Sequence, residues 1–156
     1  MVSSILFICL GNICRSPLAE GVFRNEAENR GVADQLTIDS AGTGGWHIGN
    51  PPDQRSIQTA ANHGININHQ VCRRLTSNDF NTFDLIFGMD NSNIINATSA
   101  NKRNGPAQVL LFTQYAGMGD NLEIADPYYG GGEGFEIAYQ LIKQASRGAL
   151  DRLFID

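Results

Sequence analysis

The stretch Ser-Ile-Leu-Phe-Ile-Cys-Leu-Gly-Asn-Ile-Cys-Arg-Ser-Pro at residues 4–17 joins an apolar run to the start of a helical pattern. The apolar run at residues 4–10 does not alternate with polar residues, which is typical of a strand buried on both faces of a parallel sheet. A helix is predicted from about Pro17 to Arg30, because proline is favoured in a first turn and Ser16 can cap it. Gly31 is expected to end this helix.

The same alternation of strand and helix continues along the chain. Further strands are predicted at residues 36–40, 83–89 and 108–112, and further helices from Asp53 to about Gly64, after Asp90, and over residues 133–154. No repeat or interdomain linker interrupts this pattern, so residues 1–156 are expected to form one domain. The alternation predicts a three-layer α/β fold with a four-stranded parallel sheet flanked by helices on both faces, flavodoxin-like or Rossmann-like.

Residues 9–16 form a loop that is suited to binding an anion at the carboxyl end of the first strand. Every backbone N–H in the loop can donate, because the first proline is Pro17, and Gly11 and Asn12 tolerate a positive φ. Such N–H groups at a helix N-terminus attract anions, and the guanidinium of Arg15 can pair with two phosphoryl oxygens. The predicted phosphoryl site consists of Leu10, Gly11, Asn12, Ile13, Cys14, Arg15 and Ser16.

Cys9 is the predicted nucleophile of this loop. The donors that bind an anion would also stabilise a thiolate, and the hydroxyl of Ser16 can point at the sulfur. A thiolate beneath a bound phosphoryl group is placed for in-line attack. A buried structural cysteine is the usual alternative for a lone Cys, but the spacing of Cys, five residues, Arg and Ser between a strand and a helix favours catalysis.

Size, charge and cysteine content restrict the other functions. The chain has 156 residues, a net charge of −5 and no cluster of Lys and Arg, so no nucleic-acid partner is expected. Its longest apolar run is too short to cross a membrane and lacks the flanks of a signal peptide, so no membrane partner is expected. Three cysteines are too few for a disulfide scaffold, which favours a reducing cytoplasm.

Three motifs together resemble the low-molecular-weight protein tyrosine phosphatase family. They are residues 9–17, the Asp-Ser-Ala-Gly-Thr stretch at 39–43 followed by Trp46, and the Asp-Pro-Tyr-Tyr stretch at 126–129. The resemblance spans nearly the whole chain, and the order and separation of the motifs are more specific than the loop alone. It implies hydrolysis of phosphotyrosine in proteins, and of small aryl phosphates, through a phosphocysteine intermediate on Cys9 and without a cofactor.

The resemblance also implies roles for residues in the two later motifs. Asp126 would protonate the leaving oxygen as general acid and then act as general base toward water. Trp46, His47, Tyr128 and Tyr129 would border the pocket of the phosphotyrosine ring, and loop aromatics in general suggest a contact surface. The implied partners are tyrosine-phosphorylated proteins, a cognate tyrosine kinase among them, and the expected state is a monomer or weak dimer.

Supporting and redox roles follow from the same resemblance. The residues implied to hold the loop in shape are Asn12, Ser16, Ser40 and His69. Cys14 would form a reversible disulfide with Cys9 that protects the nucleophile from over-oxidation, since a resolving cysteine must lie near a reactive thiolate.

Two other interpretations stay open on the sequence alone. An arsenate reductase on the same scaffold would also begin with attack of Cys9 on an oxyanion, but Cys72 is the only cysteine outside the loop that could act as a relay. A zinc-binding or anion-binding module without turnover could nominally use Cys9, Cys14, Cys72 and His69, although a Cys-x2-Cys pair is absent. No metal site is therefore predicted.

Overall fold

The computed structural model describes residues 1–155 and contains a four-stranded parallel sheet with the order β2-β1-β3-β4. The strands are β1 (Ser4–Cys9), β2 (Thr37–Gly42), β3 (Leu85–Gly88) and β4 (Gln108–Leu111). β1 pairs with β2 on one side and with β3 on the other, so that Cys9 lies opposite Gly42 and Phe7 opposite Phe87. The predicted sheet is confirmed, and its order is that of flavodoxin-like folds.

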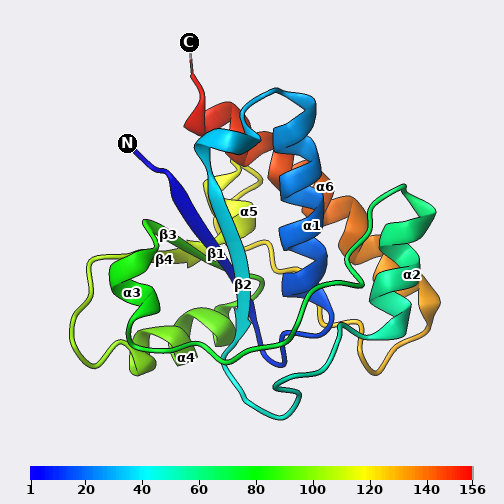
Figure 1. The fold of residues 1–156 in the computed structure, drawn as a ribbon, viewed down its shortest axis with the longest axis horizontal. Coiled ribbons are helices and arrows are strands. Elements are labelled where there is room, and N and C mark those ends of the chain that lie inside the picture. The colour runs from blue at the N-terminus through cyan, green and yellow to red at the C-terminus, as the bar shows by residue number, and fades with distance from the viewer. Residues whose placement is uncertain (156) are drawn as a thin grey trace.

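Helices cover both faces of this sheet (Figure 1). They are α1 (Arg15–Asn29), α2 (Gln54–Asn62), α3 (Asp79–Thr82), α4 (Asn91–Ala100), α5 (Phe112–Tyr115) and α6 (Gly132–Leu153). Residues of α1, α5 and α6 pack with Phe7 of β1 on one face, and residues of α3 and α4 pack with Leu6 and Ile8 on the other. The three-layer arrangement is therefore confirmed. No helix within the described residues is long and apolar enough to cross a membrane.

The central position of β1 explains its unbroken apolar run. Residues 5–8 are completely buried because helices cover both faces of the strand. Phe7 packs edge-on against Phe112, with ring centroids 5.0 Å apart. The chain continues from β1 to β2 on one side and later to β3 on the other, and this switch point opens a crevice at the carboxyl end of β1. Cys9, the last residue of β1, lies at that crevice.

The start of α1 differs from the expected one. The helix begins at Arg15, its N-cap residue is Cys14, and no side chain caps it. The expectation that Ser16 caps the helix is wrong, because Ser16 lies inside the first turn and its hydroxyl contacts Cys9. The end of the helix agrees with the prediction, since Gly31 follows it with a φ of 72°.

The other boundaries agree in part. Asp53 caps α2 as predicted, because its carboxylate accepts a hydrogen bond from the backbone N–H of Arg55 at 2.8 Å. The short helices α3 and α5 were not predicted, and β4 ends at Leu111 because Phe112 already begins α5. Single helical turns of four residues carry too little periodicity to be recognised in a sequence.

Candidate active site

A pocket of about 290 Å³ lies where β1 runs into α1. Three segments far apart in the sequence line it, at residues 9–15, 46–47 and 126–129. The predicted residues that the structure brings together here are Cys9, Leu10, Gly11, Ile13, Cys14, Arg15, Trp46, His47, Asp126, Tyr128 and Tyr129. The three sequence motifs therefore meet around one pocket.

Cys9 lies at the bottom of this pocket with only 3% of its surface exposed. Its Sγ lies 3.0 Å from the hydroxyl of Ser16 and accepts a hydrogen bond from the Ser16 backbone N–H at 3.4 Å. The Ser16 hydroxyl oxygen already accepts a hydrogen bond from Nδ2 of Asn12 at 2.8 Å, which leaves its proton free to point at the sulfur. Both the hydroxyl and the backbone N–H of Ser16 therefore face the sulfur.

Arg15 is buried beside Cys9, with 2% of its surface exposed. Its Nη1 donates to Oδ2 of Asp90 at 2.6 Å and to the carbonyl of Ile124 at 2.8 Å. Burial disfavours the charged guanidinium, but the sulfur of Cys9 and the carboxylate of Asp90 outweigh it and raise the pKa of Arg15. Its Nε is buried and has no hydrogen-bond partner within residues 1–155, so a donor remains for an anion in the pocket.

Asp90 is a site residue that sequence reasoning missed. It was expected only to precede a helix, and it does cap α4, because Oδ1 accepts from the backbone N–H of Asn93 at 2.9 Å. Oδ2 at the same time holds Arg15. The available signal was the position of Asp90 just after β3, since β3 is the neighbour of β1 and both strands end at the same edge.

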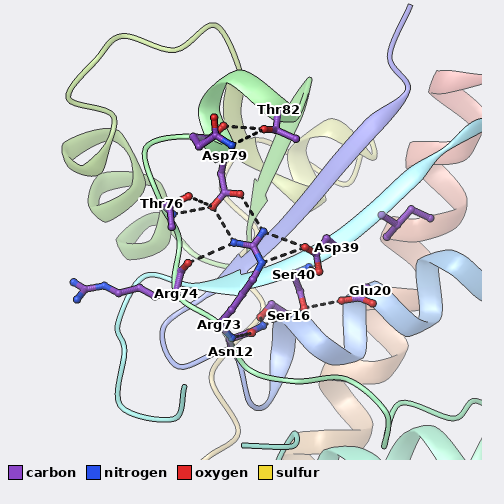
Figure 2. A network of polar contacts seen from close by, with 12 residues as sticks. Asn12, Ser16, Glu20, Asp39, Ser40, Arg73, Arg74, Thr76, Asp79 and Thr82 are labelled. Atoms are coloured by element: carbon purple, nitrogen blue, oxygen red, sulfur yellow. Dashed lines mark hydrogen bonds and ion pairs between the residues drawn. The ribbon is translucent and has the colours of Figure 1, made fainter. Parts of the chain in front are cut away.

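A chain of polar contacts around Asn12 holds the loop in shape (Figure 2). Asn12 has a φ of 58°, and its Nδ2 donates to the hydroxyls of Ser16 at 2.8 Å and Ser40 at 3.1 Å. The hydroxyl of Ser40 donates to Oε1 of Glu20 at 2.8 Å, and the backbone N–H of Arg73 donates to Oδ1 of Asn12 at 3.0 Å. The left-handed conformation of Asn12 is thus held by its own side chain.

The structure does not place His69 in this chain of contacts. His69 is exposed and makes no hydrogen bond within the described residues, whereas the adjacent Gln70 is buried and donates to the carbonyl of Pro17 at 3.0 Å. Glu20 is the partner of Ser40 instead. The expectation for His69 was wrong because the turn at residues 68–69 directs the side chain of His69 to the surface. The buried position is taken by the next residue, Gln70.

The segment at residues 72–73 supports the loop from the other side. The Cys72 thiol donates to the carbonyl of Asn12 at 2.8 Å, and burial raises the pKa of this thiol to about 11. Arg73 pairs with both carboxylate oxygens of Asp79 at 3.0 Å and with Asp39 at 3.1 Å (Figure 2). Sequence reasoning missed this ion-pair cluster.

Asp126 and the aromatic residues form the rim of the pocket. The Asp126 carboxyl is about one-third exposed, and Oδ2 lies 3.6 Å from Nη2 of Arg15. Oδ1 accepts from the backbone N–H of Tyr128 at 3.1 Å, which orients the carboxyl toward the loop. Trp46 and Tyr129 are 70% and 95% exposed, so their rings are available to a ligand.

The three cysteines are free thiols. Cys14 is buried in the same loop as Cys9, five positions later in the sequence. Burial together with the charge of Asp53 raises the pKa of Cys14 well above its ordinary value. Within residues 1–155, no group of three or more His, Cys, Asp or Glu side chains is arranged to hold a metal ion.

This fold and loop define a class of phosphatases that bind a phosphoryl group where a parallel strand turns into a helix. Comparison with known proteins narrows the class. The model of the family "low molecular weight phosphotyrosine protein phosphatase" matches residues 4–155, and the chain belongs to this family. It is therefore a phosphatase, a hydrolase.

Individual relatives support the same assignment. The chain is 48% identical over 136 residues to the low molecular weight phosphotyrosine protein phosphatase of Schizosaccharomyces pombe, covering 86% of each chain. Its structure is similar to that of a protein tyrosine phosphatase from Entamoeba histolytica, with a TM-score of 0.90, 32% identity and coverage of 97% and 96%. It is equally similar to the drosophila arginine phosphatase DARP, with a TM-score of 0.90, 32% identity and coverage of 100% and 99%.

Proposed function

We propose that residues 1–156 form a single catalytic domain that hydrolyses phosphotyrosine in proteins, and small aryl phosphates, through a phosphocysteine intermediate on Cys9. The observation that carries this proposal is the single pocket in which Cys9, Arg15 and Asp126 meet between aromatic side chains. The pocket thus contains a nucleophile, a cation and an acid, which are the groups that transfer of a phosphoryl group from an aryl oxygen requires.

In the first step, Sγ of Cys9 attacks phosphorus, and the S–P bond forms as the bond from phosphorus to the tyrosine oxygen breaks. Asp126 gives its proton to that oxygen, so that tyrosine leaves as a neutral phenol. The unpartnered Nε of Arg15 and the loop N–H groups stabilise the charge on the phosphoryl oxygens.

In the second step, a water molecule attacks the phosphocysteine and gives a proton to Asp126, which is now a carboxylate. The S–P bond breaks, inorganic phosphate forms, and the electron pair returns to Cys9. The Ser16 hydroxyl and backbone N–H, which lie 3.0 Å and 3.4 Å from the sulfur, stabilise the departing thiolate.

The rim of the pocket supports an aromatic substrate. Trp46, Tyr128 and Tyr129 can pack against a phenyl ring, and the apolar side chain of Ile13 lines the same pocket. A phosphoserine has no ring to fill this space, and a phosphoarginine would bring a polar guanidinium against Ile13. The likeness to DARP nevertheless makes phosphoarginine a necessary competitor in any assay, because that structure is named an arginine phosphatase.

Arsenate reduction is less well supported, because the acid Asp126 and its neighbouring tyrosines would have no use in it. It also needs either further cysteines of the chain in relay or an external thiol to take over from Cys9. Cys72 is 3% exposed, and its proton is engaged by the carbonyl of Asn12. These properties are those of a thiol that supports the loop.

A turnover assay on four substrates tests the proposed function. Phosphotyrosine, phosphoserine and phosphoarginine peptides are compared by phosphate release, and arsenate by arsenite formation with added thiol, with Cys9→Ser as the blank. The phosphotyrosine peptide should be hydrolysed fastest. Faster turnover of phosphoarginine or arsenate would overturn the substrate assignment, and equal rates for enzyme and blank would overturn the site.

The proposed substrates are tyrosine-phosphorylated proteins, a cognate tyrosine kinase among them. A nucleophilic thiol beside two further free thiols needs a reducing compartment, which supports a cytoplasmic location. A monomer or weak dimer is sufficient, since one chain supplies every group that the two steps use.

Asp90→Asn tests how strongly the position of Arg15 limits the reaction. The variant should lower kcat/KM for an aryl phosphate by about 10- to 100-fold, because a displacement of a catalytic group by about 1 Å has effects of this size. The melting temperature should fall moderately, because asparagine still caps α4 but no longer offers a negative charge to the buried guanidinium of Arg15. Unchanged kcat/KM would contradict the positioning role, and a large loss of stability would show that the variant acts through the fold.

The redox role of Cys14 is tested by reversibility. Peroxide should oxidise the Cys9 thiolate to a sulfenic acid, with peroxide reduced to water, and the Cys14 thiol should then displace water to form a disulfide. Thiol treatment should restore activity in the wild type and in Cys72→Ser, the matched control, but not fully in Cys14→Ser, where sulfinic acid accumulates. Full recovery of Cys14→Ser, or a mass spectrum without a Cys9–Cys14 bond, would refute the role.

A further inference from the structure

A second hollow, of about 600 Å³, adjoins the phosphoryl pocket. Leu10 and Trp46 line both spaces and thus form the wall between them. Beyond this wall lie Thr43, Ile48 and Arg74, none of which takes part in the two steps of the reaction. A ligand held in the first pocket can therefore extend directly into the second.

Arg74 supplies this hollow with an unpaired positive charge. The other arginines around the active site each contact a carboxylate, as Arg15 does with Asp90, Arg55 with Asp53 and Arg73 with Asp79. Arg74 is exposed, and its guanidinium has neither a carboxylate nor a hydrogen-bond partner within residues 1–155. Figure 2 shows its side chain extended away from the ion-pair cluster of Arg73.

The backbone of Arg74 is nevertheless firmly placed. Arg74 forms a parallel bridge with Gly42 at the end of β2, and the N–H of Leu75 donates to the Gly42 carbonyl at 2.8 Å. The aliphatic stem lies along Gly45, where an added Cβ would come within 3.3 Å of Cδ of Arg74. The charge is thus presented from a fixed base at the edge of the sheet.

The remaining surface of the hollow combines one unsatisfied polar group with an apolar rim. Oγ1 of Thr43 is buried and has no hydrogen-bond partner in the described part of the chain. Trp46 and Ile48 are 70% and 61% exposed. The Trp46 ring lies over Gly44, where an added Cβ would overlap it. The position of this ring between the two spaces therefore requires glycine at residue 44.

We propose that this hollow is a substrate subsite for an acidic side chain that lies near the phosphotyrosine of an extended phosphopeptide. A carboxylate or a second phosphate would pair with Arg74 and could accept a hydrogen bond from Thr43, while Trp46 and Ile48 cover the aliphatic part of the peptide. The inference rests on the proposed function, because the phosphotyrosine fixes the peptide beside the hollow. An extended chain advances about 3.3 Å per residue, so positions within about three residues of the phosphotyrosine are the candidates.

The net charge of the chain sharpens this inference. At −5 the molecule as a whole repels an acidic peptide, so an unpaired cation next to the active site changes the local preference. A basic peptide should be hydrolysed less efficiently, because it cannot form the ion pair with Arg74 and its positive charge is repelled by that arginine.

A peptide panel tests the subsite. Phosphotyrosine peptides carry Glu, Ala or Lys at each of the three positions on either side, and each kcat/KM is divided by the value for a small aryl phosphate on the same enzyme. At one or more positions Glu should exceed Ala by about two- to fivefold, the scale of an exposed ion pair. The preference should shrink at roughly 0.5 M salt, where such pairs are screened.

Variants of Arg74 then decide the assignment. Arg74→Ala should remove the preference for Glu, and Arg74→Glu should reverse it in favour of Lys. Arg103→Ala is the matched control, because Arg103 is also exposed, has no carboxylate partner among the described residues and lies outside both spaces. This control should keep the wild-type preference.

The failures of the two proposals are distinguishable. Hydrolysis of the aryl phosphate without any preference at any position, or a preference that Arg74→Glu leaves unchanged, would overturn the subsite and leave the phosphatase intact. No hydrolysis of any substrate would overturn the proposed function itself. Self-association that Arg74→Glu abolishes, in an enzyme without peptide preference, would assign the hollow to a second copy of the chain.

Discussion

Cys9→Ser is expected to abolish turnover of aryl phosphates and phosphotyrosine peptides while the protein keeps its fold and still binds phosphate or vanadate. A serine hydroxyl needs a base to become a nucleophile, and the groups in contact with Sγ of Cys9 are the hydroxyl and N–H of Ser16. These groups stabilise a thiolate, but they cannot remove a proton from an alcohol. The loop N–H groups and Arg15 are untouched, so the anion site should persist.

The measurement combines single-turnover kinetics with titration of phosphate and thermal unfolding. If phosphate binding is lost together with turnover, the substitution has disrupted the loop. The loss of turnover would then not support Cys9 as the nucleophile. Turnover by Cys9→Ser at the wild-type rate would show that another group attacks phosphorus. A phosphorylated protein trapped at low pH from the wild type, and absent from Cys9→Ser, would identify the intermediate.

Asp126→Asn is expected to slow hydrolysis of ordinary aryl phosphates by about 10²–10⁴-fold, the usual effect of losing a general acid. Asparagine can still accept the hydrogen bond from the Tyr128 N–H, so the loop should keep its conformation. The amide cannot supply a proton to the leaving oxygen, and the phenolate must leave as an anion.

Dependence on the leaving group separates this role from a structural one. The loss should shrink for substrates whose phenols are strong acids, because such oxygens leave without protonation. Asp120→Asn is the matched control, since Asp120 is an exposed aspartate of the preceding loop and does not line the pocket. Equal slowing for all substrates would exclude proton donation by Asp126.

The sequence predicted the sheet and the centre of the site because both depend on local patterns. The unbroken apolar run of β1 reflects burial on both faces, and the Cys-x5-Arg-Ser spacing reflects one loop between one strand and one helix. Contacts that depend on the register of separate elements were not predictable in the same way. Asp90 reaches Arg15 only because β3 lies next to β1, and Glu20 meets Ser40 only because α1 lies against β2.

Adjacent residues show the same limit most clearly. Arg73 and Arg74 are chemically identical neighbours, yet one is held by Asp39 and Asp79 and the other extends without a partner (Figure 2). The difference arises because residues 73–75 lie along the end of β2, where successive side chains point to opposite sides. Neither the composition of this segment nor its spacing shows which of the two arginines is paired.

The division of the Asp90 carboxylate between two partners links phosphate binding to the order of α4. Oδ1 holds the first turn of that helix and Oδ2 holds Arg15, so both contacts are lost if Asp90 moves. By reciprocity, an anion that immobilises Arg15 must also stabilise the start of α4, and fraying of that turn must weaken the anion's hold. An anion bound in the pocket is therefore expected to make the first turn of α4 more resistant to local unfolding, on the face of the sheet opposite α1.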